Sequence, residues 1–151
     1  MNSSDQNYVL ELTPEDYQKA YVEVAFLLDA FASTIDNIMG GNTAPVGRIA
    51  GRDTARKLPL ELSDPTLQDV IGALSRQMQA GFEFTLDEDR LLFKRCILRE
   101  MCALRNIETG AALCRLFHSY FDGIANGLLC RPVKSQIVSV GEECQFLTAV
   151  Q

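Results

Sequence analysis

The residues best suited to chemistry lie near the C-terminus, in the stretch 110–146. This stretch holds three of the five cysteines and the only histidine of the chain. Cys114 and His118 are four residues apart, so on a helix both side chains share one face and can bind the same ion. A thiolate with an imidazole suits zinc, iron or copper. The candidate ligands of a metal site are therefore Cys114, His118, Cys130 and Cys144. A haem group whose iron is bound by His118 is a second possibility.

The same helix also suits the wall of an apolar pocket, because large aromatic residues are followed by Gly123 and Gly127. An apolar ligand would then lie between this helix and a sheet, with His118 as its polar anchor. The expected wall residues are Cys114, Phe117, His118 and Phe121. Ordinary packing of buried thiols and aromatic rings in a core is the alternative explanation of the pattern.

A stripe of arginines precedes this region. Arg48, Arg52 and Arg56 recur every four residues, so they share one face of a helix. One interpretation is a site for an anionic group of a ligand, with Arg52 at its centre. The other is a solvated face with Asp53 as a counter-charge.

Motifs for catalysis are scarce. The sequence has no GxSxG elbow, HExxH motif, phosphate-binding loop or dinucleotide fingerprint. Cys114 and His118 could pair as nucleophile and base, but no third group is evident to orient them. The sequence therefore favours a binding domain over an enzyme.

Composition sets the class of protein. A chain of 151 residues with 47% apolar and 23% charged residues is typical of one globular domain. The net charge of -6 argues against nucleic acid as a partner. No apolar run reaches the roughly 18 residues that a membrane-spanning helix needs, and the N-terminus lacks the layout of a signal peptide. We therefore expect a cytoplasmic protein without membrane insertion, whose cysteines are free thiols or ligands.

Helix and strand signals alternate in blocks along the chain. Thr13 and Pro14 begin a first helix, whose apolar residues recur at spacings of three and four until Gly40 and Gly41 end it. So apolar a helix is either central to the core or half of a subunit interface. A second helix is expected over 44–58, a third from Asp64 to about residue 81, and a long one over 110–129. The expected strands are 82–86, 91–98, 134–140 and 144–150, and residues 101–107 are a loop or a short helix.

The predicted fold class is α+β. Three N-terminal helices, an antiparallel hairpin, one long helix and a C-terminal hairpin would pack around one antiparallel sheet. Residues 1–12 are a leader and residues 13–151 a single ligand-binding-type domain. Within it, residues 13–41 would be a helical extension for dimerisation and residues 42–151 the core.

The core resembles the 4-vinyl reductase, or hydrocarbon-binding, domain family over roughly residues 40–151. Three features carry the resemblance besides the central hairpin: the small-residue helix around Gly47, Gly51 and Ala55, the Cys114 helix with its two glycines, and the segment 141–146. The resemblance implies a fold related to subunits of the TRAPP tethering complex and, more distantly, to haem nitric-oxide/oxygen binding domains. It also implies a small-molecule binding or sensing module, usually dimeric.

Several members of that family bind zinc through cysteines near the C-terminal hairpin. Cys144 matches the last of these positions, whereas the preceding one falls near Ile137 or Val138, which cannot bind a metal. Cys130 or His118 would have to substitute.

Three functions remain open from the sequence. The leading one is a homodimer that binds a small apolar or tetrapyrrole-like molecule. The second is a metal-bearing sensor with zinc or haem iron, and the third is an assembly protein that acts through its first helix. The sequence does not identify the ligand.

Overall fold

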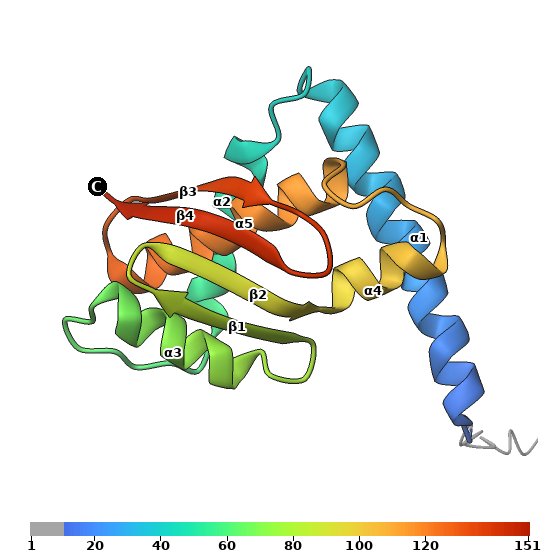
Figure 1. Ribbon diagram of the computed structural model, residues 1–151, viewed down its shortest axis with the longest axis horizontal. Coiled ribbons are helices and arrows are strands. Elements are labelled where there is room, and N and C mark those ends of the chain that lie inside the picture. Colours follow the sequence, from blue (N-terminus) through green and yellow to red (C-terminus); the bar gives the residue numbers. More distant parts are fainter. Residues whose placement is uncertain (1–10) are drawn as a thin grey trace, which may run out of the picture.

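The computed structural model describes residues 11–151 of the chain (Figure 1). The fold is α+β, with helices first, a hairpin, a long helix and a second hairpin, as the sequence predicts. The elements in chain order are α1 (Pro14–Ile38), α2 (Ala44–Lys57), α3 (Leu67–Gln77), β1 (Phe82–Asp87), β2 (Arg90–Cys96), α4 (Ile97–Leu104), α5 (Ala112–Leu129), β3 (Val133–Ser139) and β4 (Cys144–Val150). The leader predicted over residues 1–12 lies outside the described residues except for its last two.

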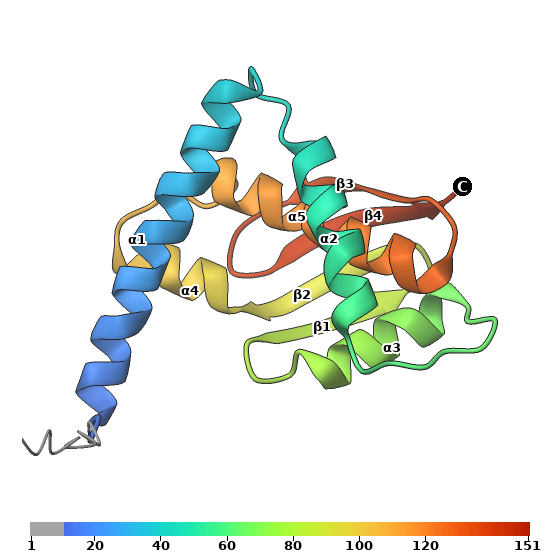
Figure 2. The same ribbon diagram turned by 180° about the vertical axis from the view of Figure 1, so that it is seen from behind.

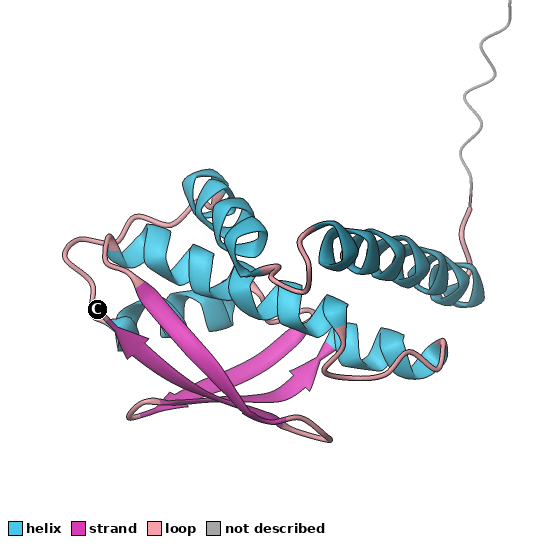
Figure 3. Cartoon of the chain, turned by 90° about the horizontal axis from the view of Figure 1, so that it is seen from above, coloured by secondary structure: helices cyan, strands magenta, loops and turns pink. Residues whose placement is uncertain are grey.

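The two hairpins join into one antiparallel sheet in the order β1-β2-β4-β3. The second hairpin enters the sheet through β4, where Phe93 of β2 pairs with Cys144 and Leu91 pairs with Phe146. The helices gather on one side of the sheet (Figure 3). Exposed polar residues such as Glu83 therefore alternate with buried ones such as Phe84 along the strands, as expected for a sheet with one solvated face.

Aromatic rings form the core between the sheet and α5. Phe93 of β2 is the centre of this cluster, with ring centroids of Phe84 at 4.8 Å, Phe121 at 5.3 Å and Phe146 at 5.5 Å. Most of these pairs are edge-to-face, the arrangement that the ring quadrupole favours. The cluster holds the first and second hairpins against the same helix.

Helix α2 crosses α5 at very short range because glycines face each other there. A Cβ atom added to Gly51 would lie 2.0 Å from the carbonyl oxygen of Tyr120, and one added to Gly123 would lie 2.4 Å from the carbonyl oxygen of Arg48. Gly47 and Gly127 meet the opposite helix in the same way. The small residues Gly47 and Gly51 thus allow the backbones of α2 and α5 to come close together.

Helix α1 is not central to the core, so that alternative for its apolar stripe is wrong. Ala25 and Ala32 are the buried residues of this helix, and they pack it against the body. The large side chains point outward, with Phe31 61% and Ile38 77% exposed. The alternative of half a subunit interface stays open for this face.

Several boundaries differ from the sequence prediction for local reasons. The start predicted at Asp64 is wrong, because Thr66 caps α3 through a capping box with Asp69. Strand β2 ends at Cys96 and runs directly into α4, where a longer strand was expected. Helix α5 begins at Ala112 without a side-chain cap, rather than at residue 110. The predicted cap at Thr13 is confirmed, with a reciprocal hydrogen-bond pair to Asp16.

We predict that Gly51→Ala destabilises the protein by about 1–3 kcal/mol, because its new methyl group has no space between the two helix backbones. The control is Gly72→Ala in α3, where the nearest atom is the side-chain Nη1 of Arg76 at 3.7 Å. That change should stabilise the protein by about 0.5–1 kcal/mol, because glycine is a poor helix former. Urea unfolding of both variants measures the difference, and equal effects would contradict the close crossing.

Candidate functional site

An apolar hollow lies between α1 and α2, which diverge over the N-terminal half of α5 (Figure 2). This groove has a volume of about 420 Å³, within the range of small-molecule sites. Leu28 and Ile35 of α1 form one side and Val46 and Ala50 of α2 the other. The remaining lining residues are Gly47, Met78, Phe82, Leu98, Leu113, Leu116, Phe117 and Tyr120. All of them are apolar apart from the hydroxyl group of Tyr120.

A second hollow lies between α5 and the sheet. It is a small cavity of about 30 Å³, enough for one water-sized occupant. Three cysteines line it, Cys96, Cys114 and Cys144, together with Phe93, Leu98, Arg99, Thr109, Phe117, Val140 and Phe146. Arg99 donates to the sulfur of Cys144 over 3.4 Å. This is the location that the sequence predicts for a ligand, but it is far smaller than the groove.

Phe117 and Leu98 separate the two hollows, because both side chains line both. The ring of Phe117 stacks on that of Phe82, with centroids 5.0 Å apart and planes nearly parallel. Of the predicted wall residues, Phe117 therefore lies at the point where both hollows meet. Cys114 lines the small cavity but not the groove.

His118 belongs to a polar cluster on the other side of the same helix. Its Nε2 atom is hydrogen-bonded to Oγ of Ser135 on β3. The Ser135 hydroxyl also lies 2.5 Å from Oδ1 of Asp122, and the Ser135 backbone N–H donates to Oδ2 of Asp122 over 3.0 Å. The imidazole stacks on the ring of Phe146 at 4.9 Å. The cluster thus ties α5 to strand β3.

Burial sets the charges of this cluster. It lowers the pKa of His118, and the nearby guanidinium of Arg48 on α2 lowers that pKa further, while Asp122 opposes both. Burial raises the pKa of Asp122, against the hydrogen bonds from Ser135. The imidazole is therefore neutral at pH 7. When Asp122 is ionised, the Ser135 hydroxyl donates to it, so Nε2 of His118 carries the imidazole proton and donates to Ser135.

This arrangement does not match a Ser–His–Asp triad. In such a triad the carboxylate orients the imidazole, and the imidazole contacts the hydroxyl. Here Asp122 bonds to the hydroxyl and the backbone of Ser135, and its Oδ2 lies 3.9 Å from Nε2 of His118. The geometry indicates a structural link between helix and strand. Asp122 and Ser135 were not foreseen, although the spacing of four between His118 and Asp122 was a readable signal.

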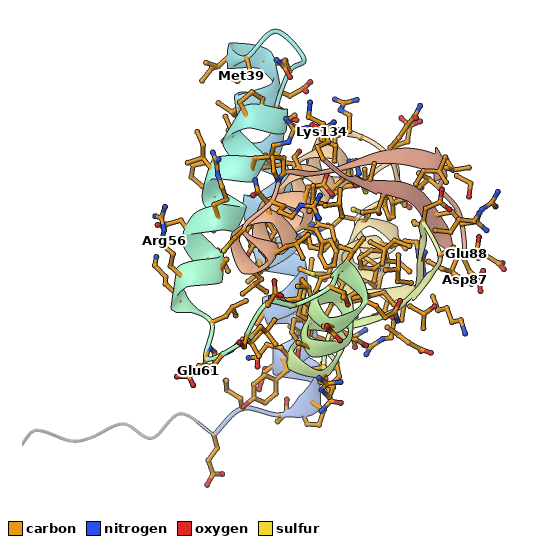
Figure 4. All side chains as sticks on the ribbon, turned by 90° about the vertical axis from the view of Figure 1, so that its left-hand side faces the viewer. Met39, Arg56, Glu61, Asp87, Glu88 and Lys134 are labelled. Atoms are coloured by element: carbon orange, nitrogen blue, oxygen red, sulfur yellow. The ribbon has the colours of Figure 1, made fainter. Side chains whose placement is uncertain are left out.

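Two predicted ligand residues lie away from both hollows. Phe121 lies in the aromatic core, 3% exposed, and lines neither hollow. Arg52 is exposed on α2 and also lines neither. Its neighbour in the arginine stripe, Arg56, projects away from the body (Figure 4) and pairs with Asp53 over 3.4 Å, as a solvated face would.

The four proposed metal ligands are not brought together. Cys130 is exposed at the C-terminal end of α5, whereas Cys114 lies near its N-terminal end. Nε2 of His118 is occupied by Ser135. Across residues 11–151, no three cysteine, histidine or acidic side chains are close enough to hold a metal ion. Burial raises the pKa of Cys102 to about 11, so this thiol is neutral at pH 7.

Comparison with known proteins gives no family assignment: no family model, curated protein or solved structure matches the chain. The resemblance to hydrocarbon-binding domains therefore stays a prediction. Within the described part of the chain, the helices are too short or too polar to cross a membrane.

We predict that His118 makes stability depend on pH below neutrality. Because its folded pKa is lowered from 6.5, the unfolded chain binds more protons as the pH falls through 6.5, and the folded state loses stability there. The chain has no other histidine. Thermal melts between pH 7 and pH 5 should show a smaller fall in Tm for His118→Gln than for the wild type. Parallel curves for both proteins would refute this role.

Proposed function

We propose that the protein is a small-molecule-binding module whose ligand is apolar and lies in the groove between α1 and α2. The observation that carries this proposal is the groove itself, with about 420 Å³ of space and an almost wholly apolar lining. Apolar ligands gain free energy by leaving water for such a surface. The floor on α5 is rigidly supported, since that helix is held by the aromatic core and by the α2 crossing.

The lining also suggests what the ligand is not. Among residues 11–151, no charged side chain lines the groove, so an anionic or cationic group would have no partner there. A hydrocarbon or aromatic molecule with few polar atoms is the class that fits best. The resemblance to hydrocarbon-binding domains agrees with this class, while a metal-bearing sensor is disfavoured by the scattered ligands.

The protein would act in the cytoplasm as a homodimer. Five free cysteines agree with a reducing compartment, and the exposed apolar face of α1 agrees with self-association.

Filling the groove should weaken ligand binding. We predict that Ala50→Trp lowers the affinity for the fluorescent apolar probe N-phenyl-1-naphthylamine by at least about tenfold, equivalent to ~1.4 kcal/mol. Ala50 lines the groove but is exposed, so a larger side chain there does not disturb the core. Probe titration followed by fluorescence measures the effect.

The matched control is Ile49→Trp, one residue earlier on the same helix. Ile49 is 61% exposed and does not line the groove, so this variant should bind the probe as the wild type does. A wild-type protein that does not bind the probe, or equal binding by both variants, would count against a ligand in the groove.

A second candidate function is assembly with other proteins through α1, and the exposed apolar side chains of that helix favour it. Phe31→Asp places a charge on this face without touching the groove. If assembly is the function, the variant should keep its fold by circular dichroism yet lose self-association in analytical ultracentrifugation. Unchanged association would argue against this candidate.

A further inference from the structure

The apolar face of α1 has the spacing of a coiled-coil seam. Seven residues follow one another at alternating steps of four and three, the repeat that keeps a seam facing a partner helix. They are Tyr17, Tyr21, Val24, Leu28, Phe31, Ile35 and Ile38, here called the α1 seam. The body of the protein contacts the neighbouring alanine face of α1 instead. The seam thus has no partner helix among residues 11–151.

Charges are kept away from the α1 seam. The helix carries five acidic residues and one lysine, at Glu15, Asp16, Lys19, Glu23, Asp29 and Asp36. None of them is a seam residue, and none occupies either of the two heptad positions directly beside the seam, such as that of Leu27. Two copies of the seam can therefore meet without bringing like charges together. The acidic surplus disfavours an anionic lipid surface, which attracts basic amphipathic helices.

The exposed area also fits a helix-sized partner. Six of the seven seam residues, and Leu27 beside them, are between 38% and 77% exposed. Together they reach the scale of about 800 Å² that each partner buries in a standard interface. A patch of this size and composition is rare on a monomer and marks an interaction surface.

The α1 seam and the groove share two residues. Leu28 and Ile35 belong to the seam and also form the α1 side of the groove. A helix that packs along the seam therefore lies next to the open mouth of the groove. It would place apolar side chains over a ligand that this chain alone leaves open to water.

We propose that α1 of a second copy packs along the α1 seam and closes the groove, so that each ligand site is built from two chains. The inference rests on the proposed ligand in the groove and adds the partner that completes its site. Because the closed site requires the dimer, ligand and second copy must strengthen each other's binding.

Leu27→Asp tests this arrangement. Leu27 flanks the seam, is 57% exposed and does not line the groove, so the substitution places a charge at the dimer contact without altering the groove of its own chain. The expected result is a folded monomer by light scattering with at least about tenfold weaker binding of N-phenyl-1-naphthylamine, equivalent to ~1.4 kcal/mol. The control, Ala30→Asp, introduces the same charge at an exposed residue off the seam and should leave mass and binding unchanged.

The outcomes separate the shared site from the groove itself. A Leu27→Asp monomer that binds the probe as tightly as the wild type would overturn the shared site and leave the groove ligand standing. A wild-type protein that is monomeric at micromolar concentration would overturn it too, even if α1 then bound lipid vesicles or another protein. Failure of the wild type to bind the probe would remove the proposed function and the shared site together, while the mass of Leu27→Asp would still report whether α1 pairs.

Discussion

The contact between the backbones of α2 and α5 is the constraint on which most of the structure depends. Gly47 and Gly51 on one helix and Gly123 and Gly127 on the other remove the side chains that would keep the two helices apart. Each glycine costs about 1 kcal/mol of helix propensity relative to alanine. That cost is offset by a crossing so close that it fixes where α2 lies on the body.

Two features follow from the position of α2. Its N-terminal half stands beside α5 and supplies Val46 and Ala50 to the groove. Its Arg48 is held near His118 and Asp122, where the guanidinium charge favours a neutral imidazole and an ionised carboxyl group. The groove and the polar cluster are therefore consequences of the same helix crossing, on opposite sides of α5.

The sequence predicted the elements well, but it did not show which candidate residues lie together, because the two depend on different kinds of signal. Local sequence signals predicted the α+β order of the elements. They are the cap at Thr13, the glycines after α1 and the alternation of apolar and polar residues in the first hairpin. The start of α3 was missed although Thr66 and Asp69 spell a capping box, because the nearby proline suggested an earlier start.

The site depends on contacts between distant segments, which spacing alone does not encode. Phe117 lies at the wall of a hollow, whereas Phe121, one turn further along the helix, faces the aromatic core. Nothing in the spacing reveals that Ser135, thirteen residues beyond Asp122, returns to bond with it. The exposure of the α1 stripe was likewise unreadable, since a core helix and an interface helix share one pattern.

The attachment of α1 has a consequence for how the fold opens. Two buried alanines hold the helix to the body, and Gly40 and Gly41 at its end have positive φ angles. Its other contacts are at the surface: Glu23 with Arg105 at 3.2 Å, Asp36 with Arg115 at 3.0 Å, and the Arg105 guanidinium over the Phe26 ring at 4.1 Å. Exposed ion pairs contribute about 0–1 kcal/mol each. In a single copy, helix α1 is thus cheaper to unfold locally than α5, which buries many more of its residues.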